Sequence, residues 1–173
     1  MTLLDVMEVE TAKNYSFLDE KFQSPPKEIE DRLQIPTKRV KNYLIDVDDI
    51  IGTYHSDYQN IDFRKVCEHL KRSCEFKEHD VDDENFLKEL YDKKDPSKNY
   101  AWELIIYNGK GYIVNGHHRT VLAKLLAKCG KIPSKIYVPV VFIVDLSSYE
   151  GDDKCEEMRA RRLKDFERAM SNG

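Results

Sequence analysis

The side chains best suited to chemistry lie in one short segment, which comprises Asn115, Gly116, His117, His118, Arg119 and Thr120. A glycine before a helix lets backbone N–H groups approach an anion closely. The arginine offers a rigid fork for bidentate phosphate binding, and the threonine adds a hydroxyl donor. Either histidine could bind phosphate or transfer a proton near neutral pH. We therefore predict that all six residues bind phosphate or a nucleotide and that both histidines are catalytic. A plain turn with one histidine capping the helix remains an alternative.

A second group of candidates consists of three carboxylates within four positions, Asp46, Asp48 and Asp49. They follow a short apolar run that predicts a strand. Carboxylate oxygens are ligands for a hard cation such as Mg²⁺. We predict that Asp46 and Asp48 bind the metal and that Asp48 or Asp49 acts as a base. The alternative is a polar strand end with an aspartate that caps a helix.

The elements that must position the first segment can be predicted from local patterns. Strands on both sides of Asn108-Gly109 predict a hairpin, because a type I′ turn needs positive φ at both central residues. Apolar residues on one face over 120–129 predict a helix, and Gly130 is a natural stop for it. The apolar, β-branched run 137–146 predicts a buried strand. Pro139 cannot donate to a ladder, so we expect its paired part to begin at Val140.

The upstream half of the chain supplies further helices. Asp62 is a plausible N-cap for a helix with one apolar face that reaches position 74, and 83–91 predicts another amphipathic helix. The first of these helices holds Cys67, His69 and Cys74, with His79 beyond it, and all four are zinc-ligand types. Cys67 and His69 would project roughly 200° apart on a helix, so core thiols are favoured over zinc. The order of elements predicts an α+β fold, a small mixed sheet with flanking helices.

Composition bounds the class of protein. The chain has 173 residues, 40% of them hydrophobic, and a formal net charge of −4, which fits one packed domain. A pI near 5.8 argues against dominant non-specific binding of nucleic acid. The N-terminus lacks a basic start, and no apolar run approaches the roughly 20 residues that span a bilayer. We therefore expect a cytoplasmic protein with reduced cysteines and no membrane partner.

The hairpin, the Gly-x-x-Arg turn, the following helix, Ile132-Pro133 and the final apolar strand together resemble the ParB/sulfiredoxin-like domain. The resemblance covers about 39–146. It implies an N-terminal arm or extension (1–38), a nucleotide-binding domain (39–146) and a C-terminal basic helix (147–173). The glutamine-proline-arginine signature that often follows the first strand of ParB proteins is missing. Tyr54, His55, Tyr58 and Gln59 stand there instead.

The resemblance also bears on activity. Sulfiredoxins carry a nucleophilic cysteine where this chain has His117. The resemblance therefore lends no support to an activity in sulfinic-acid reduction. The motif Gly-His-His-Arg most resembles that of the free-serine kinases of this fold, in which an aspartate stands where this chain has Asn115. The resemblance therefore implies a nucleoside di- or triphosphate and Mg²⁺ as cofactors.

Three functions follow as hypotheses. The first is a nucleotide-binding enzyme that performs Mg²⁺-dependent phosphoryl transfer or nucleotide hydrolysis at the corner 116–119. The second is a ParB-like DNA nuclease or DNA-binding protein that uses the basic residues of the C-terminal helix. The third is a catalytically inactive regulatory or inhibitor protein, acting on a protein partner through that helix.

Overall fold

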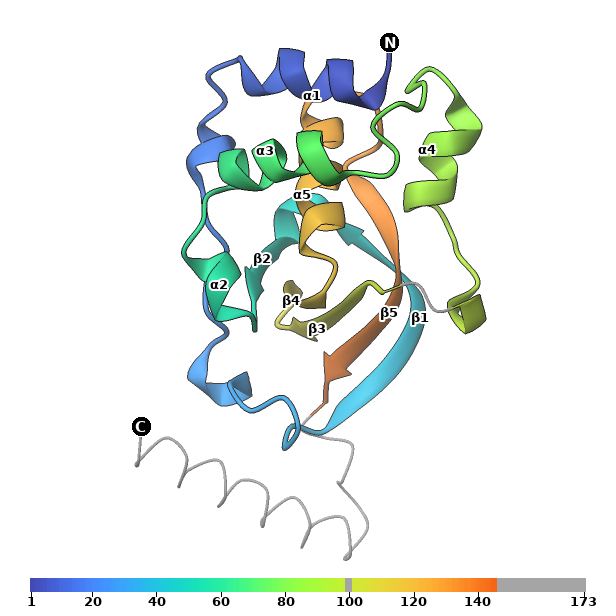
Figure 1. The fold of residues 1–173 in the computed structure, drawn as a ribbon. Helices are drawn as coiled ribbons and strands as arrows, with labels where there is room; N and C mark the ends of the chain where they lie inside the picture. The colour runs from blue at the N-terminus through green and yellow to red at the C-terminus, as the bar shows by residue number, and fades with distance from the viewer. Residues whose placement is uncertain (99–100, 146–173) are drawn as a thin grey trace, which may run out of the picture.

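A five-stranded mixed sheet forms the centre of the protein, as seen in a computed structural model that describes residues 1–98 and 101–145 (Figure 1). The strands are β1 (Thr37–Asp46), β2 (Ile50–Thr53), β3 (Glu103–Tyr107), β4 (Lys110–Asn115) and β5 (Lys135–Val144). Their order is β1-β5-β3-β4-β2. The pairs β1/β5 and β3/β4 are antiparallel, whereas β2/β4 and β3/β5 are parallel. The predicted α+β class with a small mixed sheet is thus confirmed.

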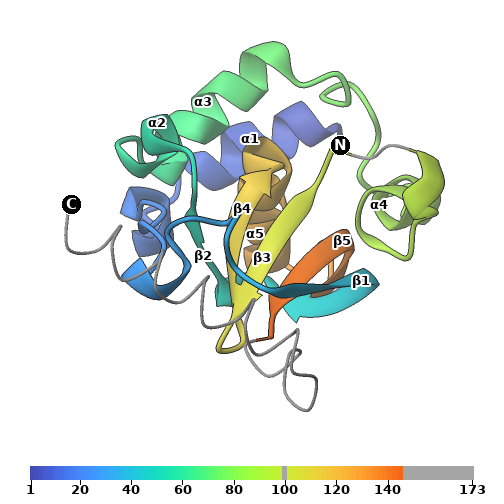
Figure 2. The ribbon, with the colours of Figure 1, turned by 90° about the horizontal axis from the view of Figure 1, so that it is seen from below.

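Helices cover one face of this sheet (Figures 1 and 2). The α-helices are α1 (Leu3–Thr11), α2 (Ser56–Gln59), α3 (Phe63–Ser73), α4 (Glu84–Tyr91) and α5 (His117–Lys128). Short 3-10 turns are η1 (Ser16–Asp19), η2 (Lys27–Ile29), η3 (Val47–Asp49) and η4 (Pro96–Lys98). Helix α5 packs against α3, which in turn contacts α1. Within 1–98 and 101–145, no helix combines the length and apolarity needed to cross a bilayer.

The N-terminal segment belongs to the same core as the rest of the chain. Leu3, Met7 and Leu18 are fully buried and join the main apolar cluster between the helices and the sheet. On the opposite sheet face, Ile29 packs with Ile105 in a smaller cluster. The predicted boundary at position 38 therefore does not separate two packing units. The predicted C-terminal helix, 147–173, lies outside the described residues.

Local signals were accurate where the conformation depends on neighbouring residues. Asn108 and Gly109 both have positive φ, 51° and 75°. The Asp62 carboxylate accepts from the Lys65 N–H at 2.8 Å and so caps α3 as predicted.

The pairing of β5 was only half predicted. Its ladder with β3 begins at Val140, as expected, but its ladder with β1 begins already at Lys135. The expected start was wrong on that side because β1 leaves the ladder opposite Pro139. The residue there is Asn42, with φ 49°, and its side-chain amide bonds the backbone of Lys94 at 2.7 and 2.9 Å.

Candidate anion-binding site

Strand β4 ends at Asn115, and α5 begins two residues later at His117. Between them Gly116 adopts a left-handed conformation with φ 102° and ψ 35°, and no side chain caps the helix. The Thr120 N–H closes the first turn on the Gly116 carbonyl. The earlier N–H groups of α5 thus have no intrahelical acceptor, which is the arrangement that favours an anion at a helix start.

Trp102 explains why a glycine is required at this turn. A Cβ on Gly116 would lie 2.2 Å from Cδ1 of the buried indole. The indole N–H donates to the Thr120 hydroxyl at 3.1 Å, and that hydroxyl donates to the Gly116 carbonyl at 2.8 Å. Thr120 is fully buried. Its hydroxyl therefore holds the turn together and does not face a ligand, which corrects its predicted role as a phosphate donor.

His117 is buried within the protein rather than presented to solvent. Its side chain is 8% exposed, and Nε2 lies 2.5 Å from the Thr53 hydroxyl. The ring stacks on Tyr58 with centroids 4.0 Å apart and planes 5° apart. Burial, and then the nearby His55 and His118, lower the pKa of His117 to about 4. At neutral pH this imidazole is therefore uncharged, and the Thr53 hydroxyl and the Tyr58 ring fix its position.

His118 is exposed, so of the two histidines of the Gly-His-His-Arg segment it is the one that a ligand can reach. Its Nε2 lies 3.1 Å from the Tyr58 hydroxyl. Burial of part of the ring, followed by the charge of His69 on α3, lowers its pKa below the ordinary value. His118 is therefore a neutral imidazole near pH 7, able to accept a proton.

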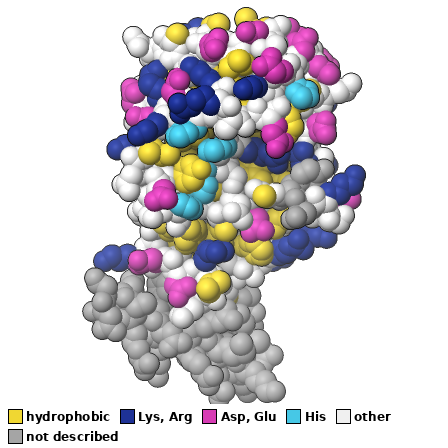
Figure 3. Space-filling model, viewed as in Figure 1, with side chains coloured by type: hydrophobic (Ala, Val, Ile, Leu, Met, Phe, Trp, Pro, Cys, Tyr) yellow, Lys and Arg dark blue, Asp and Glu magenta, His cyan; other side chains and the backbone are white. Residues whose placement is uncertain are grey.

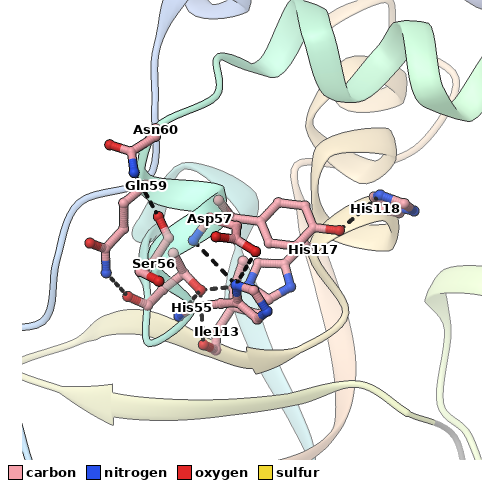
Figure 4. A network of polar contacts seen from close by, with 10 residues as sticks. His55, Ser56, Asp57, Gln59, Asn60, Ile113, His117 and His118 are labelled. Carbon is pink, nitrogen blue, oxygen red and sulfur yellow. Dashed lines mark hydrogen bonds and ion pairs between the residues drawn. The ribbon is translucent and has the colours of Figure 1, made fainter.

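The loop after β2 contributes residues whose role was not predicted from the sequence (Figure 4). His55 caps α2 and packs edge-on against both Tyr58 and His117, with centroids 5.3 and 5.7 Å apart. Gln59 Nε2 donates to the Thr53 carbonyl and fixes the end of the strand. Only one feature of the sequence pointed to these residues: they follow the first predicted strand, at the place where ParB proteins carry the signature that this chain lacks. In Figure 3, histidines gather near the middle of the same face, bordered by Lys and Arg and by hydrophobic side chains.

A cavity of about 190 Å³ lies beside the start of α5, between α3, α4 and α5. Its lining includes Cys74, Tyr91, His118 and Arg119. The Tyr91 hydroxyl is buried, and no partner for it exists among the described residues. Burial raises the pKa of this phenol, so the hydroxyl stays protonated and able to donate.

Arg119 brings a positive charge to the same cavity. Its guanidinium lies 5.7 Å from the Trp102 ring, and none of the described carboxylates forms an ion pair with it. Burial, and then the charge of Arg119, lower the pKa of Lys94 nearby. The site thus combines positive charge with two donors, the Arg119 guanidinium and the Tyr91 hydroxyl, that have no acceptor among the described residues. A bound anion would be attracted by the charge and would accept hydrogen bonds from both donors.

The carboxylates predicted to face this corner lie elsewhere. Ile50 pairs with Gly111, so the residues just before β2 sit at the Lys110 end of β4, whereas the corner follows Asn115 at the other end. Asp49 forms an ion pair with Lys110 at 2.7 Å. The Asp46 carboxylate accepts from the Asp48 N–H at 2.9 Å and caps η3.

The structure therefore does not bring these three aspartates and the corner into one site. Within the described part of the chain, no three His, Cys, Asp or Glu side chains are placed to hold a metal ion. The donor groups at the corner are N–H groups, imidazoles and a guanidinium, which fit phosphate oxygens and do not fit Mg²⁺.

Comparison with known protein families, curated sequences and solved structures found no match for this chain. The DNA-binding and partner-binding hypotheses depend on residues 147–173, where the sequence predicts a helix, and these lie outside the described residues. The described residues form a helix start with free N–H donors, beside the neutral imidazole of His118.

Proposed function

We propose that the protein binds the phosphate groups of a nucleotide at the start of α5 and transfers or hydrolyses a phosphoryl group there. One observation carries the proposal: Arg119 and Tyr91 line the same cavity beside an uncapped helix start. The Arg119 guanidinium forms no ion pair with the described carboxylates, and the buried Tyr91 hydroxyl has no partner among the described residues. Each of these donors lacks an acceptor in the described protein, and phosphate oxygens would supply one.

The residues take distinct roles in this proposal. The N–H groups of α5 and the Arg119 fork bind phosphate and stabilise charge that develops during transfer. His118, exposed and neutral, accepts the proton of the attacking water or hydroxyl. His117 is a positioning residue, since it is held by Thr53 and lies beneath Tyr58, which orients His118.

The same proposal assigns the chain to a ParB/sulfiredoxin-like fold. A mixed sheet, a hairpin that ends in Gly-x-x-Arg and a helix with a buried face support that assignment. Because none of residues 115–120 is an aspartate or glutamate, any Mg²⁺ would be held chiefly by the phosphates of the nucleotide. The steps above accordingly involve only groups of this chain.

Binding is tested by titrating ATP, ADP, AMP and inorganic phosphate, each with and without Mg²⁺, by calorimetry. The Arg119→Ala variant should bind about 10- to 100-fold more weakly, the range expected for a charge-assisted hydrogen bond. Arg39→Ala, on the exposed edge strand β1, is the matched control and should bind like the wild type. Equal weak binding by all three proteins would sink the proposal.

Catalysis is tested separately from binding. His118→Gln keeps a hydrogen-bonding side chain but removes a base that works near pH 7. It should retain nucleotide affinity within a few-fold and lose phosphate release by about 100-fold or more. A variant that turned over nucleotide like the wild type would show that His118 does not transfer the proton.

A further inference from the structure

Lys124 is a buried amine on α5, seven residues beyond His117. Its side chain is 8% exposed. The ammonium carries three N–H donors, yet within the described part of the chain the Val47 carbonyl is its one hydrogen-bond acceptor. The Phe63 ring centroid lies 5.8 Å from Nζ. Such a buried amine is either left partly unsatisfied as a cation or exists in part as the free base.

This amine lines a cavity of about 570 Å³ that is separate from the anion-binding corner. The buried side chains of Phe17, Ile50 and Phe63 are among its lining residues, beside several polar and charged ones. Exposed Lys21 and Lys128 stand on its lining, where they can hold an anionic group. The volume falls within the usual range for small-molecule sites.

The protonation state of Lys124 favours reactivity. Burial lowers its pKa to about 8, although the carboxylates of Asp48, Glu20, Asp46 and Asp49 oppose that shift. At pH 7 roughly one molecule in ten then carries a free amine, against roughly one in 3,000 for a lysine of ordinary pKa. A desolvated lysine is the usual nucleophile for carbonyl compounds.

We propose that Lys124 forms an imine with a small aldehyde or ketone that carries a carboxylate, and that Lys21 and Lys128 hold the carboxylate. The free amine attacks the carbonyl carbon, a C–N bond forms, and a proton moves from nitrogen to oxygen to give a carbinolamine. Loss of water then gives the imine, and hydrolysis reverses both steps. No oxidant or reductant is consumed.

The charges around the cavity favour this reaction over simple anion binding. Asp48 and Glu20 line the same space as Lys124 and would repel an anion placed directly at Nζ. A neutral carbonyl group meets no such repulsion. The same carboxylates can accept and return the proton that the carbinolamine step moves.

Reductive trapping tests the proposal. The whole protein is incubated at pH 7 with a low concentration of glyoxylate and cyanoborohydride, and the modified lysines are located by peptide mass spectrometry. Acetaldehyde serves as the matched carbonyl without a carboxylate. With both probes, Lys124 should be modified at least tenfold faster than the median lysine of the chain. The Lys124→Met variant should lose that adduct and keep the slow background.

The contribution of the rim is measured with Lys21→Gln and Lys128→Gln. Each should slow glyoxylate trapping at Lys124 by about two- to fivefold, as expected for exposed charges, and leave acetaldehyde trapping unchanged. If Lys124 is modified only after the protein is unfolded, while exposed lysines react in the folded protein, the proposal is overturned. Equal slowing with both probes would overturn the assignment of the carboxylate to the rim.

Discussion

The phenol ring of Tyr58 lies flat on the imidazole of His117, with centroids 4.0 Å apart and planes 5° apart. Its hydroxyl lies 3.1 Å from Nε2 of His118, the next residue along α5. One side chain from the short helix α2 therefore fixes both histidines, one through its ring face and the other through its oxygen. The loop after β2 thus orients the corner without belonging to its motif.

Two substitutions of Tyr58 should separate these contacts. Tyr58→Phe keeps the stacked ring, so we expect a loss of at most about 1 kcal/mol in the free energy of unfolding. Tyr58→Ala also removes the stacking and should cost a further 1 kcal/mol or so. Urea denaturation measures both changes. Tyr58→Phe should also lower nucleotide turnover while the affinity for nucleotide stays the same. If the two variants lost the same free energy of unfolding, the ring stacking would contribute nothing to stability.

The buried imidazole makes stability depend on pH. Burial, with His55 and His118 nearby, lowers the pKa of His117 to about 4 in the folded protein. In the unfolded chain a histidine has its ordinary pKa near 6.5. Between these values the unfolded state binds a proton that the folded state does not, so stability is full above pH 6.5 and falls as the pH drops towards 4. We expect a loss of about 2–3 kcal/mol from this residue.

This pH dependence is measured as the free energy of unfolding in urea at pH 7.5 and pH 4.5. In His117→Gln the loss between the two pH values should shrink by at least half, although the variant starts less stable. His79→Gln, at an exposed position, is the control and should keep the wild-type loss. An unchanged loss in His117→Gln would assign the effect to other groups.

Features set by near neighbours could be predicted from the sequence. The Asn108-Gly109 turn and the Asp62 cap depend on a few adjacent residues. The helix expected over 120–129 is also present, although α5 begins three residues earlier, at His117. The hairpin, the helix and the buried strand are likewise local patterns. For this reason the α+β class and the position of the corner were accessible without a structure.

Features set by strand order could not be predicted in this way. Asp48 and Asp49 were expected at the corner, but β2 runs parallel to β4, and this places them at its far end. The periodicity of α4 predicts that Tyr91 is buried, yet it says nothing of whether the hydroxyl finds a partner. Thr120 was expected to bind phosphate because it directly follows Arg119. Its hydroxyl instead accepts a hydrogen bond from the indole N–H of Trp102, which is distant in the sequence.

The turn before α5 should tolerate no side chain. Alanine at Gly116 combines a strained φ of 102° with a Cβ that would lie 2.2 Å from Cδ1 of Trp102. We expect Gly116→Ala to destabilise the protein by about 3 kcal/mol or more, from left-handed strain of about 1–2 kcal/mol together with a displaced indole. Thermal and urea unfolding measure the change.

Gly109 provides the matched control for that substitution. Its φ is 75°, and nothing lies within 4 Å of the position that a Cβ would take. Gly109→Ala should therefore cost only the backbone strain, about 1–2 kcal/mol. A similar cost for both variants would mean that the indole moves aside freely, and the close approach of Trp102 would then not explain the glycine.

The Tyr91 hydroxyl should stabilise a complex and destabilise the free protein. It is buried without a partner among the described residues, and such a group costs about 1–3 kcal/mol of stability. Tyr91→Phe removes the oxygen and keeps the ring against Trp102, so the free protein should become more stable by about 1 kcal/mol. The affinity for phosphate should fall by about three- to tenfold, because one donor to the anion is lost.

Opposite signs in the two measurements distinguish a ligand-binding hydroxyl from one that merely packs. Leu90→Ala is the control, because it shortens a neighbouring buried side chain of the same cavity. It should destabilise the protein by about 2–4 kcal/mol and leave the affinity for phosphate unchanged. If Tyr91→Phe left phosphate affinity unchanged while stabilising the protein, the hydroxyl would be no part of the site. If it lowered stability instead, the hydroxyl would have a partner in the folded chain, and Arg119 alone would have to carry the anion.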